Sequence, residues 1–193
     1  MMNHNPESVS PYEFRPLSDG ERVESFDCGD ADLNDFIVNM AHLYQQEMLA
    51  VTYVIEEAAT KKILAYFSLM NDKISLSEFE NKTEFNRFRK RRFVNAKRLT
   101  SYPALKIGRL AVSKEAKELN LRLGSAILNW IKISFTNSSF VNIHKTGCRF
   151  LTVDAYVDAI PFYEKNDFEA ITESDKEDRH TRLLYYDLSV NKK

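Results

Sequence analysis

Apolar residues recur along this chain at a spacing of two in some stretches and of three to four in others. Residues 12–17 alternate, which is typical of a half-buried strand, and a Ser-Asp-Gly turn follows them. Residues 49–56 and 63–70 are rich in β-branched and aromatic side chains and predict an antiparallel hairpin at the centre of a sheet, turning at Lys61 and Lys62. Four more strands are predicted at 106–112, 149–153, 168–172 and 182–188.

The helical spacing occurs in two strong stripes and one short segment. Asp30 is placed to cap the first helix, whose stripe is Leu33, Phe36, Ile37, Met40, Ala41 and Tyr44. The second stripe consists of Leu123, Ala126, Ile127, Trp130 and Ile131. We expect Asp158 to cap a short third helix with Pro161 in its first turn, where a missing N–H does no harm.

The resulting order is strand, helix, three strands, helix, strand, helix and two strands. It indicates one mixed α/β domain over residues 12–188, preceded by a loose polar tail at 1–11. Residues 71–103 fit least well, because their phenylalanines are scattered among charges, and we expect an irregular basic insert there. Polar loops are expected at 136–147 and 173–178.

Composition narrows the function classes. The 193 residues suffice for a sizeable core, and a net charge of -1 gives no overall bias toward nucleic acid or membrane. Cys28 and Cys148 are far apart, which favours reduced thiols in a cytoplasmic protein. No apolar run reaches the roughly 18 residues of a membrane span, and no signal peptide is expected. The histidines do not cluster, so we expect no metal site.

The connection between strand 106–112 and the next helix is the first candidate for binding chemistry. A strand that feeds a helix places unpaired N–H groups at the positive end of the helix dipole, which is a natural seat for a phosphate. The connecting residues are Leu119, Asn120, Leu121, Arg122, Leu123, Gly124 and Ser125. Taken alone, a glycine that opens a helix is common and carries no functional weight.

Two stretches carry a family resemblance. Leu110, Ala111 and Val112 precede the helix, and residues 159–168 read A-I-P-F-Y-E-K-N-D-F. The latter is similar to the A-x-x-F-Y-E-K-x-G-F signature of the acetyl-CoA-dependent N-acetyltransferase (GNAT) superfamily, with Asp167 where glycine is usual. Together with residues 26–33 and the G-R-L-A-V strand, the chain looks most like a branch with many toxins that acetylate aminoacyl-tRNA.

The resemblance implies a fold and a set of roles. It implies an α/β (α+β) GNAT fold with a mixed, mostly antiparallel sheet of six to seven strands flanked by helices. Backbone N–H groups of Leu110 or Val112 would face the thioester, and residues 110–112 and 119–125 would bind acetyl-CoA. Tyr163 matches the tyrosine that protonates the coenzyme A thiolate. An unperturbed phenol pKa of about 10 keeps that proton in place at neutral pH.

The connecting loop departs from the family pattern Q/R-x-x-G-x-G/A. The corresponding positions here are Leu119, Arg122 and Gly124, so only the last glycine is kept. Backbone N–H groups do not depend on the side chain, and Arg122 can itself pair with a phosphate. A missing glycine restricts close approach of the chain, so the loop is where cofactor affinity is most at stake.

A dense basic run is the second signal. Its residues are Arg87, Arg89, Lys90, Arg91, Arg92, Lys97 and Arg98, interleaved with Phe88 and Phe93. One interpretation is a solvated helix face whose phenylalanines pack inward. A second is a patch for RNA phosphates with a phenylalanine available for stacking. A third is a site for an acidic partner, including an antitoxin or a second subunit.

The sequence therefore predicts an N-acetyltransferase in which a primary amine, on a small molecule or a macromolecule, attacks acetyl-CoA directly without a metal. No carboxylate base stands out. One alternative is toxin-like acetylation of aminoacyl-tRNA, with residues 87–98 as the tRNA seat. Another is a binding module that kept the fold and lost catalysis. The acceptor stays open, as does a homodimer.

Overall fold

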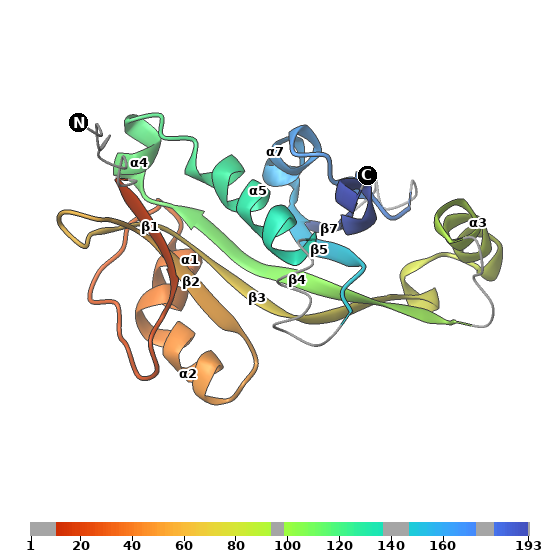
Figure 1. The fold of residues 1–193 in the computed structure, drawn as a ribbon, viewed down its shortest axis with the longest axis horizontal. Helices are drawn as coiled ribbons and strands as arrows, with labels where there is room; N and C mark the ends of the chain where they lie inside the picture. The colour runs from red at the N-terminus through yellow and green to blue at the C-terminus, as the bar shows by residue number, and fades with distance from the viewer. Residues whose placement is uncertain (1–10, 94–98, 137–146, 173–179, 193) are drawn as a thin grey trace, which may run out of the picture. The chain divides into compact units, whose positions relative to one another are not determined.

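A computed structural model of the chain describes residues 11–93, 99–136, 147–172 and 180–192. Its strands form one seven-stranded sheet in the order β1-β2-β3-β4-β5-β7-β6, of which β1 to β5 and β7 are labelled in Figure 1. The strands are β1 Tyr12–Pro16, β2 Val51–Glu57, β3 Ile63–Ser75, β4 Ser101–Val112, β5 Phe150–Tyr156, β6 Glu169–Ala170 and β7 Thr181–Asp187. The sheet is mostly antiparallel, with β4 and β5 parallel. The predicted fold class is confirmed, and the seven strands follow in the predicted order, whereas the predicted order of helices omitted α3 and α4.

The flanking helices are α1 Ala31–Asp35, α2 Ala41–Gln46, α3 Lys82–Arg92, α4 Lys114–Glu118, α5 Leu123–Thr136 and α7 Ile160–Lys165. None of the helices in the described ranges is long and apolar enough to cross a membrane. The predicted tail at 1–11 and the two predicted polar loops lie almost wholly outside the described residues.

The chain divides into two compact units. The first unit combines the chain up to Ser68 with Arg109–Gly124, and the second combines Leu69–Gly108 with the chain from Ser125 onward. Strands β3 and β4 contribute residues to both units. A single domain over residues 12–188 stays a prediction.

The helical segment of the first unit shows one departure from the predicted stripe. Asp30 caps α1 as predicted, since its Oδ1 accepts the Leu33 N–H at 3.0 Å. The next five residues, Phe36–Met40, form a π-helical turn before α2 begins. The extra residue per turn shifts the buried face, so Met40 is 36% exposed while His42 is buried. The α-helical spacing had predicted that the Met40 side chain is buried.

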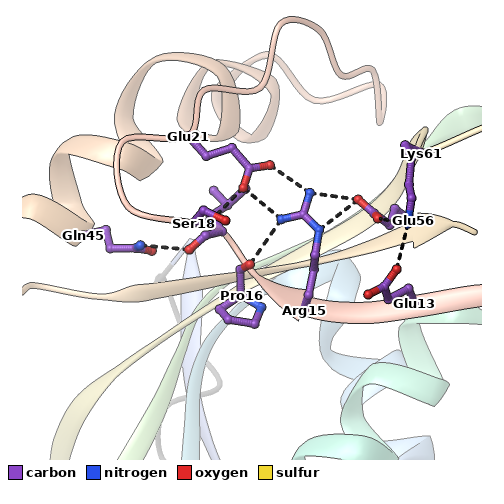
Figure 2. Close-up of polar contacts among 9 residues, drawn as sticks. Glu13, Arg15, Pro16, Ser18, Glu21, Gln45, Glu56 and Lys61 are labelled. Carbon is purple, nitrogen blue, oxygen red and sulfur yellow. Dashed lines mark hydrogen bonds and ion pairs between the residues drawn. The ribbon is translucent and has the colours of Figure 1, made fainter.

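An ion-pair network fastens β1 to β2 in the first unit (Figure 2). The Arg15 guanidinium donates to both carboxylate oxygens of Glu21 at 2.8 Å and to Glu56 at 2.8 and 3.0 Å. Lys61 lies 3.1 Å from the second Glu56 oxygen and 2.9 Å from Glu13. Burial alone raises the pKa of Glu56, but the hydrogen bonds from Arg15 and Lys61 outweigh it and hold that pKa below its ordinary value.

The second unit has an aromatic core. Phe85 and Phe88 of α3 pack into a cluster whose other buried members are Ile74, Phe79, Tyr102, Ala104, Phe150 and Tyr185. Residues 71–103 are therefore more regular than the sequence predicted, because β3 continues to Ser75, α3 follows, and β4 begins at Ser101. Charged residues on the solvent side of α3 obscured its narrow apolar face in the sequence.

Helices α5 and α7 lie side by side in the second unit (Figure 1). Helix α5 buries Ile127, Leu128 and Ile131, although Ala126 of the predicted stripe is exposed. Pro161 lies in the first turn of α7 as predicted. Asp158 does not cap this helix. It lies in a 3₁₀ turn, Val157–Ala159. The Val157 carbonyl accepts the Ile160 N–H, the group that a capping Asp158 side chain would otherwise accept.

Candidate active site

The predicted thioester-facing residues lie near the end of β4. In the described part of the chain, β4 pairs with β5 only over three residues, from Ala104 with Phe150 to Lys106 with Thr152. Leu110 and Val112 lie beyond this short ladder and are half-buried, while Ala111 is 3% exposed within the core of the first unit. The N–H groups to which the resemblance assigns the thioester therefore belong to the part of β4 that follows the ladder.

Helix α4, which the sequence did not predict, follows β4 directly. Ser113 caps it by accepting the Ala116 N–H at 3.2 Å, and donates its own N–H to Leu64 at 2.8 Å. Lys114 lies 2.8 Å from the Asp27 carboxylate, and its hydrogen bond is the main reason that the pKa of Asp27 is lowered. The helix is thereby fixed to the segment before α1.

The connection between α4 and α5 uses several of its N–H groups internally. Those of Leu119, Asn120 and Leu121 donate to α4 carbonyls at 2.9, 3.0 and 3.1 Å. The first N–H groups of α5, from Leu123 onward, have no acceptor inside their own helix. Among the seven residues predicted to contact phosphate, those at the start of α5 are therefore better placed to donate a backbone N–H to an anion than residues 119–121, whose N–H groups are already used.

Two residues at positions where the resembled pattern has glycine adopt a backbone conformation typical of glycine. Arg122 has a φ of 52°, in the left-handed region where glycine is the least strained residue. Asp167, at the other position where the family has glycine, has a φ of 63°. Both loops therefore keep a glycine-like path with a different side chain.

This conformation leads to a testable expectation for Arg122. Arg122→Gly removes a left-handed penalty of about 1–2 kcal/mol, and the greater freedom of glycine in the unfolded chain offsets about 0.5–1 kcal/mol of it. We expect a net stabilisation of up to about 1.5 kcal/mol in denaturant unfolding. Arg122→Ala keeps the strain and should show no gain. Calorimetry with acetyl-CoA then asks whether the side chain contacts phosphate, in which case both variants bind more weakly.

Tyr163 lies in the middle of α7 and is 7% exposed. Its ring packs edge-on against Phe162 and Phe168, with centroid distances of 5.0 and 5.5 Å. Burial raises the pKa of Tyr163 to about 12. The phenol is therefore fully protonated at neutral pH, as a proton donor must be before it acts.

Some residues of the basic run are exposed, whereas others are engaged in contacts with the rest of the second unit. Arg87, Lys90 and Arg91 are exposed on one face of α3 at spacings of three and four. Arg92 instead donates to Glu169 at 3.2 Å and to the Tyr185 hydroxyl, and Arg89 is half-buried. Lys97 and Arg98 lie outside the described residues.

The two phenylalanines considered for base stacking are engaged in packing. Phe88 is 7% exposed and packs against Phe79, Phe150 and Tyr185. Phe93 stacks on Tyr102, with ring centroids 4.2 Å apart. The structure matches the inward-packing interpretation for both rings.

Sequence reasoning passed over a polar cluster where the β4–β5 ladder ends. Lys106 forms an ion pair with Asp154, and the buried Thr152 hydroxyl donates to Asp72. Asp154 is 47% exposed, so it is a carboxylate that an amine can reach. The signal in the sequence was a pair of polar residues at alternate positions, Thr152 and Asp154, of a strand in which residues 150, 151, 153 and 155 are apolar.

Comparison with solved structures identifies the fold. A tyrosine-to-phenylalanine mutant of KacT matches with a TM-score of 0.67 at 18% identity, covering 94% of this chain and 98% of that one. AtaT complexed with acetyl-methionyl-tRNAfMet matches with a TM-score of 0.65 at 16% identity, covering 94% and 97%. The chain has the GNAT fold. A mutant AtaT toxin bound to acetyl-CoA and to the C-terminus of the antitoxin AtaR also matches, with a TM-score of 0.62 at 17% identity, covering 94% and 98%.

Comparisons at the level of sequence find no relative of this chain. No protein-family model matches it, and no curated protein matches it significantly. Within the described ranges, no group of three or more His, Cys, Asp or Glu side chains is arranged to hold a metal ion.

Proposed function

We propose that the chain is an N-acetyltransferase that moves an acetyl group from acetyl-CoA to a primary amine by direct attack. The observation that carries the proposal is Tyr163, a buried and protonated phenol on α7 within the F-Y-E-K segment of a GNAT fold. A solved structure of the same fold, the mutant AtaT toxin, has acetyl-CoA bound.

The proposed reaction needs three services from the chain. The neutral amine attacks the thioester carbon, and the oxyanion that forms accepts a backbone N–H from Leu110 or Val112. As the C–S bond breaks, Tyr163 gives its proton to the thiolate, and the new ammonium loses a proton to solvent, from which the phenol is restored. Because burial raises the pKa of Tyr163 to about 12, the phenol holds its proton until the thiolate forms.

Acetyl-CoA is proposed to bind two stretches of the chain, residues 110–112 and the connection that leads into α5. Residues 110–112 would contact the pantetheine, and Arg122 together with the start of α5 at 123–125 would hold the pyrophosphate through N–H groups at the positive end of that helix. This seat holds an anion through the backbone, so it tolerates the departure at Arg122.

A coenzyme A release assay tests the proposal across amines, polyamines, peptides and charged tRNA. Release that depends on one acceptor class supports the enzyme and names its substrate. If no acceptor releases coenzyme A and calorimetry shows no binding at millimolar acetyl-CoA, the chain is the non-catalytic module and the proposal fails.

Aminoacyl-tRNA is the second candidate acceptor. Arg87, Lys90 and Arg91 present a basic face on α3, and the GNAT-fold protein AtaT has been solved with acetyl-methionyl-tRNAfMet. The same face fits an acidic protein partner, for which the AtaT–AtaR antitoxin complex is a precedent of this fold. A homodimer also stays a prediction.

The basic face gives this candidate a direct measurement. Changing Arg87, Lys90 and Arg91 together to Gln should weaken binding of charged tRNA at least 10-fold at low salt. It should also reduce the salt slope by about 1 for each phosphate that the face no longer neutralises. Lys61→Gln with Lys62→Gln, on the first-unit hairpin, is the control for loss of charge. An unchanged salt slope in the α3 variant would exclude this face as the tRNA seat.

A further inference from the structure

The turn after α7 is held in a conformation that its residue rarely adopts. Asp167 has a φ of 63°, which is disfavoured for a residue with a Cβ. Within the turn, the N–H groups of Asn166 and Phe168 both donate to the Tyr163 carbonyl, at 2.9 and 3.1 Å. The geometry of this turn therefore bears directly on the residue assigned as proton donor.

Lys132 of α5 reaches this turn. Its side chain is only 9% exposed, and its Nζ donates to the Asn166 carbonyl at 2.6 Å and to the Asp167 carboxylate at 3.1 Å. The same nitrogen lies 4.0 Å from the centroid of the Tyr186 ring. A lysine buried to this degree is costly unless its charge is compensated, and these three contacts compensate it.

The two hydrogen bonds from Lys132 to Asn166 and Asp167, called the clamp below, offset two unfavourable features at the end of α7. Asn166 is the C-terminal cap of that helix, where carbonyls lack intrahelical partners and carry the negative end of the dipole. The Asp167 carboxylate adds a second negative charge beside it. The Lys132 ammonium satisfies the carbonyl and balances the carboxylate.

A short chain of contacts leads from the clamp to the phenol. Phe168 follows Asp167, and its ring packs against the Tyr163 ring with centroids 5.5 Å apart. The Phe168 ring also packs against the Tyr186 ring, with centroids 5.8 Å apart, and the Lys132 ammonium lies over Tyr186. A turn that loosens would release Phe168 and, with it, the support of the Tyr163 ring.

We propose that Lys132 is a positioning residue for Tyr163: its ammonium clamps the turn at Asn166 and Asp167 and so fixes the orientation of the phenol. The inference rests on the proposed function, because it gives Lys132 a role in presenting the proton donor. A glycine at position 167 would need no such clamp, whereas an aspartate with a positive φ and a charge at a helix end does.

The kinetic test removes the charge and keeps the length of the side chain. Lys132→Met should lower kcat by about 10-fold, since small misplacements of reacting groups cost this much, with little change in KM for acetyl-CoA. In a Tyr163→Phe background the same substitution should cause no further loss, because there is no hydroxyl left to orient. An equal loss in both backgrounds would overturn the proposal, since it would indicate less folded protein.

Two further variants sharpen the test. Asp167→Gly, combined with Lys132→Met, removes the charge and the strain that the clamp balances, and should restore most of kcat. Lys73→Met removes an exposed lysine of β3 from the second unit and should leave kcat unchanged. Failure of the glycine to restore activity would contradict the clamp.

Hydrogen exchange gives a readout that does not need activity. The Asn166 and Phe168 amides should exchange about 10-fold faster in Lys132→Met than in the wild type, and should recover when Asp167→Gly is added. Unchanged exchange would refute the clamp. If exchange responds as expected while the wild type acetylates no amine, the proposed function fails and the clamp between α5 and α7 stands.

Discussion

Tyr163→Phe is expected to lower kcat on the order of 100-fold or more while the affinity for acetyl-CoA changes little. The substitution removes one oxygen and keeps the ring that packs against Phe162 and Phe168. The thiolate then has to leave without a positioned donor, and water is a poorer substitute in a buried setting. Steady-state kinetics and calorimetry measure the two quantities separately.

The control for this variant is another buried tyrosine. Tyr102 is 2% exposed, and its hydroxyl has no hydrogen-bond partner among the described residues, so Tyr102→Phe removes a phenolic oxygen without breaking a hydrogen bond. We expect it to keep wild-type kcat and to be at least as stable. Equal turnover in Tyr163→Phe and in the wild type would show that the proton comes from elsewhere.

Arg15→Met is expected to cost about 3 kcal/mol of unfolding free energy. The Glu56 side chain is 3% exposed, and without Arg15 its buried charge keeps only Lys61, which is itself 62% exposed. Lys61→Met is the matched control and should cost at most about 1 kcal/mol, because Arg15 still pairs with Glu56. Denaturant unfolding of the two variants separates these expectations, and equal losses would contradict the dominant role of Arg15.

A second substitution and a pH series test the cause. Adding Glu56→Met to Arg15→Met should recover much of the loss, since an apolar pair replaces an uncompensated charge. The pKa of Glu56 and that of Glu21 are lowered in the folded wild type. Their contribution is present above the unfolded pKa of about 4.3 and is lost as pH falls through the folded value. The stability gap between wild type and Arg15→Met should therefore narrow on acidification.

The order of strands and main helices could be predicted because each has a clear apolar period and a turn signal at its ends. The π-helical turn at Phe36–Met40 could not, because nothing in the residue types distinguishes it from an α-helix. Helix α3 was hidden for another reason. Its buried face consists chiefly of Phe85 and Phe88, while basic residues make up most of its last turn.

The site shows a similar division. Tyr163 and residues 110–112 could be predicted as site residues because each lies within a stretch of several residues that matches a family pattern. The left-handed backbone at Arg122 and Asp167 could not be predicted from an arginine and an aspartate, which rarely adopt it. Lys132 was missed because a single lysine in a helix indicates a solvated position, and only the packing of α5 against the α7 turn shows that it is buried.

The position of Arg15 at a border of the sheet has a further consequence. β1 and β6 are the two outer strands, and an outer strand offers unpaired backbone groups that recruit strands from other molecules. β6 has only two residues, while β1 carries Glu13, Arg15 and Pro16, features that discourage such pairing. Arg15→Met would thus remove a guard against aggregation as well as an ion pair, and light scattering of concentrated samples would record it.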